Sequence, residues 1–170
     1  MKLWDKGIET NKLVEQFTVG SDREMDLYLA PFDVMGTMAH ITMLQSIGLL
    51  QKTELDTLLA ELKKIYKTAA AGNLTIEDDV EDIHSQVELM LTRTLGDMGK
   101  KVHSGRSRND QVLVDMKLYL RHEVKQIFDL TSKLFETLIM LSNKHKDDLM
   151  PGYTHLQVGI ARSEEHTSEL

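Results

Sequence analysis

Residues 108–144 read RNDQVLVDMKLYLRHEVKQIFDLTSKLFETLIMLSNK, a run without proline or glycine. Apolar residues recur in it at steps of three and four, broken only at Thr131, which predicts a helix with an apolar stripe. The stripe comprises Leu113, Met116, Leu120, Val124, Ile127, Leu134, Leu138 and Leu141, and it is widened by Val112, Tyr119, Phe128, Phe135 and Ile139. At a rise of about 1.5 Å per residue this helix would be on the order of 55 Å long. No other segment predicts such a length, so its partners should come from other subunits or from sequence beyond this chain.

Three shorter helices are predicted before the long one. They cover about 33–47, 53–72 and 75–96, and residues 1–32 are predicted to form an irregular lead-in that ends at Ala30-Pro31. The chain has only two prolines and 10 glycines, its polar and apolar residues never alternate for long, and its β-branched residues do not cluster. The sequence therefore predicts an all-α fold with little evidence for strands.

Capping residues define the ends of the first two of these helices. Asp33 can accept hydrogen bonds from the first turn of its helix, and Gly48 suits the end of that helix. Thr53 begins the second helix, where Asp56 completes an imperfect capping box, and Gly72 closes it.

The third helix is predicted to begin at Thr75, because acidic residues favoured near a helix N-terminus follow it closely. These residues are Glu77, Asp78, Asp79, Glu81 and Asp82. Its buried stripe would be Val80, Ile83, Val87, Met90 and Leu91, with Gly96 and Gly99 at its end.

Composition excludes several classes of protein. The 170 residues are 41% hydrophobic and 28% charged, which is enough apolar material for a packed core. A net charge of −7 argues against a wide cationic surface for nucleic acid, and the absence of cysteine excludes disulfides and thiol catalysis. No signal peptide or membrane span is predicted, so we expect a soluble, cytoplasmic protein.

The first segment that could carry chemistry is HSGRSRND at 103–110, directly before the long helix. Open N–H groups at a helix N-terminus attract anions, and the forked donors of Arg106 and Arg108 suit a carboxylate or phosphate. Asn109 offers a donor and an acceptor, while Ser107 and Asp110 could cap the helix. An anion site and a merely capped turn with solvated arginines both remain open.

The second segment is MPGYTHLQ at 150–157. Pro151-Gly152 predicts a tight turn, so that Thr154 and His155 would emerge from constrained backbone. An imidazole can move protons near neutral pH, and a neighbouring hydroxyl can orient a substrate. A single histidine is also often an ordinary surface or core residue, so both interpretations stay open.

A third segment, EDIH at 81–84, places His84 at the border of an apolar stripe. A metal site there would need further converging ligands, and the acidic residues are explained as helix-start charges. We therefore favour a structural role for His84 and predict no metal site.

Taken together, these segments resemble the argininosuccinate lyase family of the fumarase/aspartase superfamily, over residues 1 to about 158. The resemblance rests on LWDKG at 3–7, GTMAH at 36–40, EDIH at 81–84, HSGRSRNDQ at 103–111 and PGYTHLQ at 151–157. The nine-residue stretch at 103–111 is the most specific of these, and it separates the family from fumarases and adenylosuccinate lyases.

The resemblance implies a small N-terminal helical domain, a central bundle of long helices and a C-terminal helical domain. In the family, the bundles of four subunits pack together into a homotetramer, and each active site is formed by residues from three chains. Here 1–104 would be the N-terminal domain, 105–158 the truncated start of the bundle, and 159–170 a non-native tail.

The implied reaction is the cofactor-free elimination of argininosuccinate to L-arginine and fumarate in arginine biosynthesis. By position in the motifs, Ser107, Arg108, Asn109 and Thr154 would bind substrate, and His155 would take part in acid/base chemistry. In an incomplete chain that lacks the family's mobile serine loop, we expect no activity.

Two departures from the family pattern matter. Gly20 stands where the family has an early substrate-binding serine, so Ser21 or Thr18 is the expected substitute. From residue 159 the family pattern stops, and RSEEHTSEL at 162–170 resembles a translated sequencing adapter. We expect this tail to be an assembly artefact, which the codons beneath it would test.

Three other interpretations stay open. The chain could belong to another lyase of the superfamily, although the stretch at 106–110 argues against this. It could be a non-catalytic structural protein of the same fold, or a helical interaction module, which would leave the two polar motifs unexplained.

Overall fold

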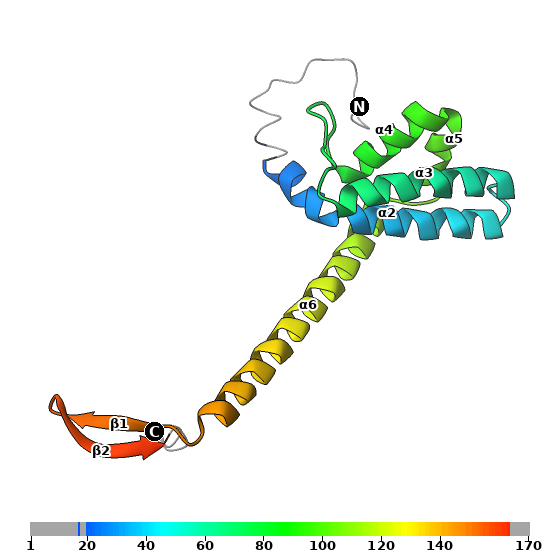
Figure 1. Ribbon diagram of the computed structural model, residues 1–170. Coiled ribbons are helices and arrows are strands. Elements are labelled where there is room, and N and C mark those ends of the chain that lie inside the picture. Colours follow the sequence, from blue (N-terminus) through cyan, green and yellow to red (C-terminus); the bar gives the residue numbers. More distant parts are fainter. Residues whose placement is uncertain (1–16, 18–19, 164–170) are drawn as a thin grey trace. The chain divides into compact units, whose positions relative to one another are not determined.

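The structure is a computed structural model that describes residue 17 and residues 20–163 (Figure 1). The LWDKG segment at 3–7, Thr18 and the last seven residues of the predicted tail lie outside this range. The chain divides into two units, Met1–Arg121 and His122–Leu170. The predicted domain boundaries concern the complete protein and stay predictions.

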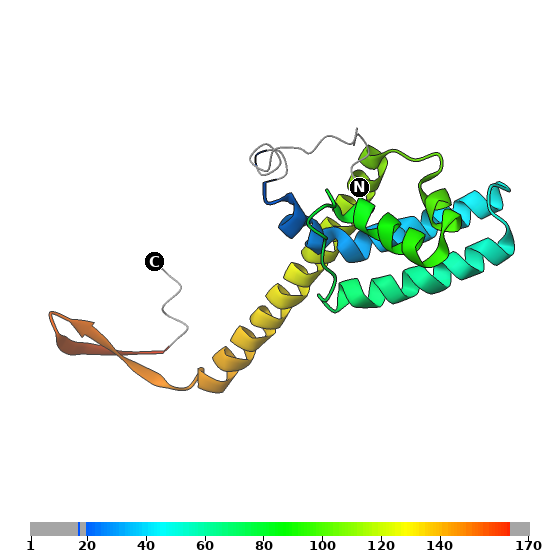
Figure 2. The same ribbon diagram turned by 90° about the horizontal axis from the view of Figure 1, so that it is seen from above.

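The described part of the chain is mostly helical, which confirms the predicted all-α class. The helices are α2 (Asp22–Ser46), α3 (Lys52–Ala70), α4 (Ile83–Leu95), α5 (Asp97–Lys100), the short 3-10 helix η1 (Lys101–His103) and α6 (Arg108–His145). In the first unit α2 and α3 lie side by side, with α4 and α5 against them (Figures 1 and 2).

The core of the first unit forms where the apolar stripes of α2, α3 and α4 meet. Its fully buried members are Val34, Ile41, Leu44, Leu58, Leu62, Ile83 and Leu91. The apolar stripe of α3 faces this core, because Leu55, Leu58, Leu62 and Ile65 are all buried and Leu59 and Tyr66 pack against it. Removing this apolar surface from water is the main stabilising contribution.

The predicted irregular lead-in is wrong for residues 22–32, because α2 begins at Asp22 and runs through Pro31. Proline lacks an N–H and typically costs about 3 kcal/mol inside a helix. Here Ala30 and Val34 are buried on the face that also carries Ile41, and this packing outweighs the local cost. Asp33 is consequently not an N-cap but a buried residue in the middle of α2.

The next two helices, α3 and α4, also begin at other residues than predicted. Helix α3 begins at Lys52, and the carboxylate of Glu54 accepts the Gln51 N–H at 2.9 Å, so the capping box uses this pair and not Thr53 and Asp56. Its predicted end is confirmed, because the helix ends at Ala70 and Gly72 comes two residues later with φ +69°.

Helix α4 begins at Ile83 and not at Thr75, with Asp82 as its N-cap. Residues before it are held by side chains from elsewhere: the Arg23 guanidinium donates to the carbonyls of Val80 at 2.8 Å and Asp78 at 2.6 Å. These bonds satisfy backbone groups that a helix would otherwise pair, so the segment stays non-helical although Val80 is buried.

In the second unit a two-stranded antiparallel hairpin follows α6, which the sequence did not predict. Strand β1 (Leu149–Thr154) pairs with β2 (Gln157–Ser163), and Thr154 opposes Gln157. The tight turn is therefore at His155 and Leu156, with φ +49° and +63°, and not at Pro151-Gly152, which lies within β1. Two consecutive positive φ angles are typical of the turn that matches strand twist in a two-residue hairpin.

Candidate functional site

The segment at 103–110 lies, as predicted, at the N-terminus of the longest helix. Ser107 and Asp110 cap α6: the Asp110 carboxylate accepts the Ser107 N–H at 3.0 Å and the Ser107 hydroxyl at 2.9 Å. These hydrogen bonds lower the pKa of the exposed Asp110 carboxyl. The predicted cap is confirmed, and it fixes the backbone from which Arg108 and Asn109 extend.

Arg108 joins this segment to the EDIH motif. Its guanidinium forms an ion pair with Asp82 and donates to the Ser85 hydroxyl at 2.8 Å. Asp82 also accepts the Ser85 N–H at 2.8 Å as the N-cap of α4. Burial opposes ionisation of Asp82, but the Ser85 N–H and the Arg108 charge outweigh it and lower its pKa. The two motifs that the sequence analysis treated separately therefore form one charged contact.

Arg106 and Asn109, which lie in the same segment as Arg108, have different surroundings. Arg106 points inward and donates to the Thr37 hydroxyl of α2 at 3.1 Å, and burial lowers its pKa. Asn109, in contrast, is exposed at the start of α6. Only part of this segment is therefore exposed to solvent, and Arg106 is directed into the interior.

Arg106 also lines an open hollow between α2 and the start of α6, with a volume of about 400 Å³. Its other lining residues include Gly36, His40, Gly105 and Val114. The His40 Nε2–H donates to the Ser104 carbonyl at 2.9 Å, and burial lowers the pKa of His40. Half of the ten residues that line the hollow carry charged or polar side chains, and the other half are apolar or glycine.

A buried polar cluster lies beneath the segment, where α2, α4 and α6 meet. The His84 Nδ1–H donates to Asp33 Oδ1 at 2.7 Å, and the same nitrogen lies 3.7 Å from Asp115 Oδ2. Gln111 Nε2 donates to Asp33 Oδ1 at 3.3 Å. Each of the four residues is less than 10% exposed. We call Asp33, His84, Gln111 and Asp115 the buried cluster.

The electrostatics of the buried cluster are strongly coupled. Burial, the negative charge of Asp33 and a hydrogen bond with it raise the pKa of Asp115 to about 7. Burial works against protonation of His84, but the hydrogen bond and charge of Asp33 dominate and raise its pKa. One proton on Asp115 and one on His84 therefore reduce the charge that the fold has to bury.

Asp33, His84 and Asp115 offer ligand atoms within 4.8 Å of one another, close enough in principle to bind a metal ion. Their chemistry argues against a metal site, because His84 already donates to Asp33 and the Arg106 cation faces both carboxylates. We therefore interpret the cluster as a hydrogen-bonded network.

The sequence pattern predicted a structural role for His84 but not the contribution of Asp33 and Asp115. A signal for both was present, since each is a charged residue at a position where the helical stripe calls for an apolar one. Asp115 lies between Val112 and Tyr119 on the widened stripe of α6, and Asp33 lies between Ala30 and Thr37.

The other predicted site residues lie at two further places. Ser21 is exposed directly before α2, where its carbonyl accepts the N–H of Glu24 at 3.1 Å. Thr154 and His155 are exposed in the hairpin of the second unit, and His155 occupies the left-handed region with φ +49°. Non-glycine residues rarely adopt that conformation, so the hairpin holds His155 in an uncommon backbone geometry.

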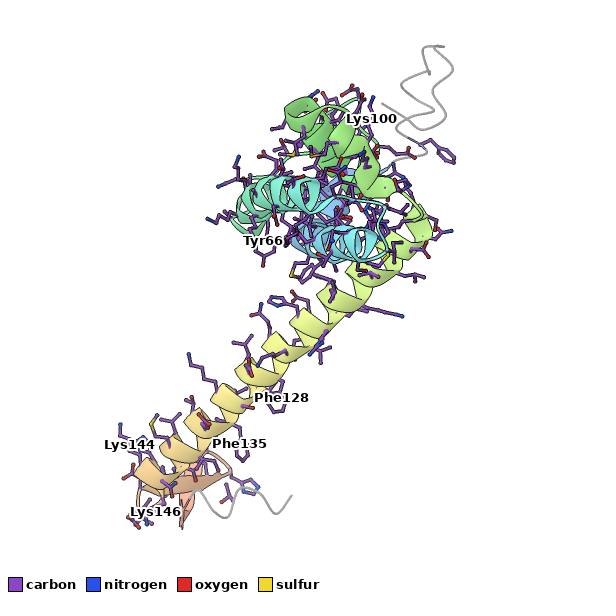
Figure 3. The ribbon with its side chains drawn as sticks, turned by 90° about the vertical axis from the view of Figure 1, so that its right-hand side faces the viewer. Tyr66, Lys100, Phe128, Phe135, Lys144 and Lys146 are labelled. Atoms are coloured by element: carbon purple, nitrogen blue, oxygen red, sulfur yellow. The ribbon has the colours of Figure 1, made fainter. Side chains whose placement is uncertain are left out.

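The part of α6 in the second unit exposes large apolar side chains. Figure 3 shows Phe128 and Phe135 projecting from its ribbon, and they are 68% and 64% exposed. Val124, Ile127, Leu134 and Leu138 are each more than half exposed. Among the described residues, no helix combines the length and apolar character needed to cross a bilayer.

The family model and the curated relatives that match this chain are all described as lyases. A family model described as "Lyase" matches residues 5–161. The chain is 62% identical to an argininosuccinate lyase of Parabacteroides distasonis and 63% identical to one of Phocaeicola vulgatus, in each case over 95% of this chain and 36% of the relative. An argininosuccinate lyase of Ruminiclostridium cellulolyticum is 42% identical over 92% of this chain and 34% of the relative. The chain thus spans about a third of the length of these curated relatives.

Proposed function

The chain belongs to the lyase family whose model spans residues 5–161, and from this premise we propose that it is the N-terminal third of an argininosuccinate lyase. The observation that carries the proposal is the identity of 62–63% to proteins of that name over 95% of the chain. A match over 95% of the 170 residues spans both polar motifs, at 103–111 and 151–157.

The proposed reaction cleaves argininosuccinate to L-arginine and fumarate without a cofactor. A base removes the proton beside a carboxylate, and the electron pair left on carbon spreads into that carboxylate. The pair then forms the carbon–carbon double bond while the carbon–nitrogen bond breaks and an acid protonates the departing guanidinium nitrogen. Because negative charge accumulates on the substrate, the site needs preorganised hydrogen-bond donors.

Ser107, Arg108 and Asn109 supply such donors in our proposal. The first N–H groups of a helix have no intrahelical acceptor, and those of Arg108 and Asn109 begin the 38-residue α6. Asp82 and Ser85 hold the Arg108 guanidinium in a defined orientation, which favours recognition of a planar carboxylate.

Thr154, His155 and Ser21 complete the proposed set. His155 would transfer or organise a proton, and Thr154 would bind the substrate beside it. Ser21 would replace the early serine of the family, and its position at the start of α2 is compatible with binding an exposed ligand. Their convergence with Ser107 and Arg108 is part of the proposal and requires neighbouring subunits.

We also propose that the complete protein is a homotetramer built on α6. The exposed apolar residues of its second half, from Val124 to Leu138, would otherwise remain in contact with water at a substantial cost. Long helices of this kind are stabilised when several pack together in a bundle. A cytoplasmic location of the enzyme stays a prediction.

The test is an assay of the uninterrupted reading frame on argininosuccinate and, separately, on adenylosuccinate, with fumarate release as the readout. We expect activity on argininosuccinate alone, loss of it in His155→Ala, and retention in His145→Ala, which removes an imidazole bonded to Asp148 at 2.6 Å. Activity only on adenylosuccinate would refute the proposal. The purified 170-residue chain should be inactive, and fumarate release well above its His155→Ala variant would contradict that expectation.

A further inference from the structure

The buried cluster lies directly beneath the segment that carries the proposed substrate-binding residues. Gln111 and Asp115 are on the first two turns of α6, two and six residues after Asn109. Their partners come from two other helices, since Asp33 belongs to α2 and His84 to α4. The start of α6 is thus attached to both helices through buried polar contacts.

These contacts are costly unless every group is satisfied. Asp33 Oδ2, Gln111 Oε1, Asp115 Oδ2 and Arg106 Nε are buried without a hydrogen-bond partner among the described residues. A buried charge or polar group left unpaired is destabilising, because it loses its hydrogen bonds to water without replacing them. An apolar cluster of similar size would stabilise the fold at least as well, so stability alone does not account for these residues.

We propose that the buried cluster is a positioning device, in which Asp115, His84 and Asp33 fix the first turns of α6 and thereby the orientation of Ser107, Arg108 and Asn109. This inference rests on the proposed function for its purpose, but its structural content can be tested without substrate. Polar contacts specify one geometry, whereas apolar contacts tolerate sliding of a helix. A hydrogen-bonded network is therefore suited to hold a binding segment in register.

The device depends on protons because its carboxyl groups face each other. Asp115 faces Asp33 on α2, His84 on α4 and Arg106 in the preceding loop. The negative charge of Asp82 also acts on His84. The negative charges of Asp110 and Glu88 act on Arg106. While Asp115 keeps its proton, it can donate to the neighbouring carboxylate. When that proton leaves, two buried carboxylates repel each other, and the attachment of α6 weakens.

The size of this effect follows from the pKa of about 7 that burial and Asp33 give Asp115. When the segment opens locally, the group returns to its ordinary acidic range and ionises. The opening equilibrium at the start of α6 should then increase by about tenfold between about pH 6 and about pH 8. His84 adds to the same trend, because its pKa is raised and the proton that stabilises its bond to Asp33 is lost as pH rises.

Amide hydrogen exchange of the 170-residue chain, corrected for the intrinsic pH dependence of exchange, measures this opening. We expect the amides of 111–115 to lose about tenfold or more of their protection over this pH range. Asp115→Asn keeps the shape of the side chain but cannot ionise. The loss of amide protection over this pH range should therefore be about tenfold smaller in this variant than in the wild type. Asp129→Asn, on the exposed part of α6, is the matched control and should retain it.

The same data separate positioning from general stability. Amides in α3 should keep their protection in Asp115→Asn, whereas a merely structural role would lower protection throughout the unit. An unchanged pH response in Asp115→Asn, or an equal loss in α3, would overturn the proposal. If Asp115→Asn does not fold, the pH dependence of exchange in the wild type decides. Protection of the amides of 111–115 that does not change with pH would then overturn the proposal. Failure of the lyase assay would refute the proposed function and leave this result intact.

Discussion

Replacing Asp82 tests the contact that joins the two polar motifs of the first unit. The side chain caps α4 through Ser85 and pairs with Arg108, and both members of this ion pair are less than a third exposed. Alanine removes both interactions, while asparagine keeps an N-cap acceptor and removes the charge. The two substitutions therefore separate the contribution of the cap from that of the ion pair.

The magnitudes follow from the two interactions. Loss of an N-cap typically costs about 1 kcal/mol. A hydrogen bond to a charged group contributes about 1.5–3 kcal/mol, against about 0.5–1.5 for a neutral one. We therefore expect Asp82→Asn to lower the free energy of unfolding by about 1–2 kcal/mol and Asp82→Ala by about 2–4 kcal/mol.

Urea denaturation followed by the helical circular dichroism signal measures both values. The pH dependence has a defined sign: the pKa of Asp82 is lowered on folding, so its contribution is present above its usual value of 3.8 and is lost as pH falls through the lower, folded value. The difference between wild type and Asp82→Asn should thus shrink in acid. Asp97→Ala, which removes the exposed pair with Lys100, serves as control and should change stability little.

Two results would refute this reasoning. If Asp82→Asn were as stable as wild type near neutral pH, the Arg108 ion pair would contribute nothing to the fold. If Asp82→Asn and Asp82→Ala were equally destabilised, the cap would be irrelevant. Either result would also remove the support that we assign to Asp82 in orienting Arg108.

Three further predictions concern packing and surface charge. A Cβ on Gly99 would lie 2.6 Å from backbone atoms of α4, so Gly99→Ala should cost about 1–3 kcal/mol. A Cβ on Gly36 would meet side-chain atoms alone, Val114 Cγ1 at 3.3 Å and Asp115 Oδ1 at 3.5 Å, so Gly36→Ala should cost less, and thermal unfolding compares the two variants. Leu62→Ala removes a fully buried side chain and should lower the free energy of unfolding by about 2–5 kcal/mol in urea titrations, and a loss below that range would place Leu62 outside the core. Asp56→Ala breaks an exposed pair with Lys52 at 3.0 Å and should change the same quantity by less than about 0.5 kcal/mol; a larger loss would contradict the assignment of this pair to the solvated surface.

Much of the fold could be predicted because the relevant information is local. The three-four spacing at 108–144 gave α6 nearly to the residue, and Ser107 with Asp110 gave its cap. Gly48 and Gly72 follow the ends of α2 and α3 with positive φ, as their freedom from a Cβ allows. All of these features depend on residues within one or two helical turns.

The missed features depend on distant residues. Pro31 argued locally against a helix, but packing against α3 and α4 overrides it. Thr75 is a sound local N-cap, yet Arg23, more than 50 residues away, binds carbonyls of the following segment, which stays non-helical. No inspection of either segment alone reveals these partners.

The candidate site shows the same division. Residue types and order alone single out Ser107–Asn109 and Thr154–His155, because forked cations, a helix N-terminus and an imidazole are recognisable by their chemistry. Only the tertiary structure turns Arg106 inward, pairs Arg108 with Asp82, and brings Asp33, His84 and Asp115 together from three helices. The physical reason is that helix capping and helical periodicity act between near neighbours in the chain, whereas the partner of a buried polar group is decided by how whole helices pack.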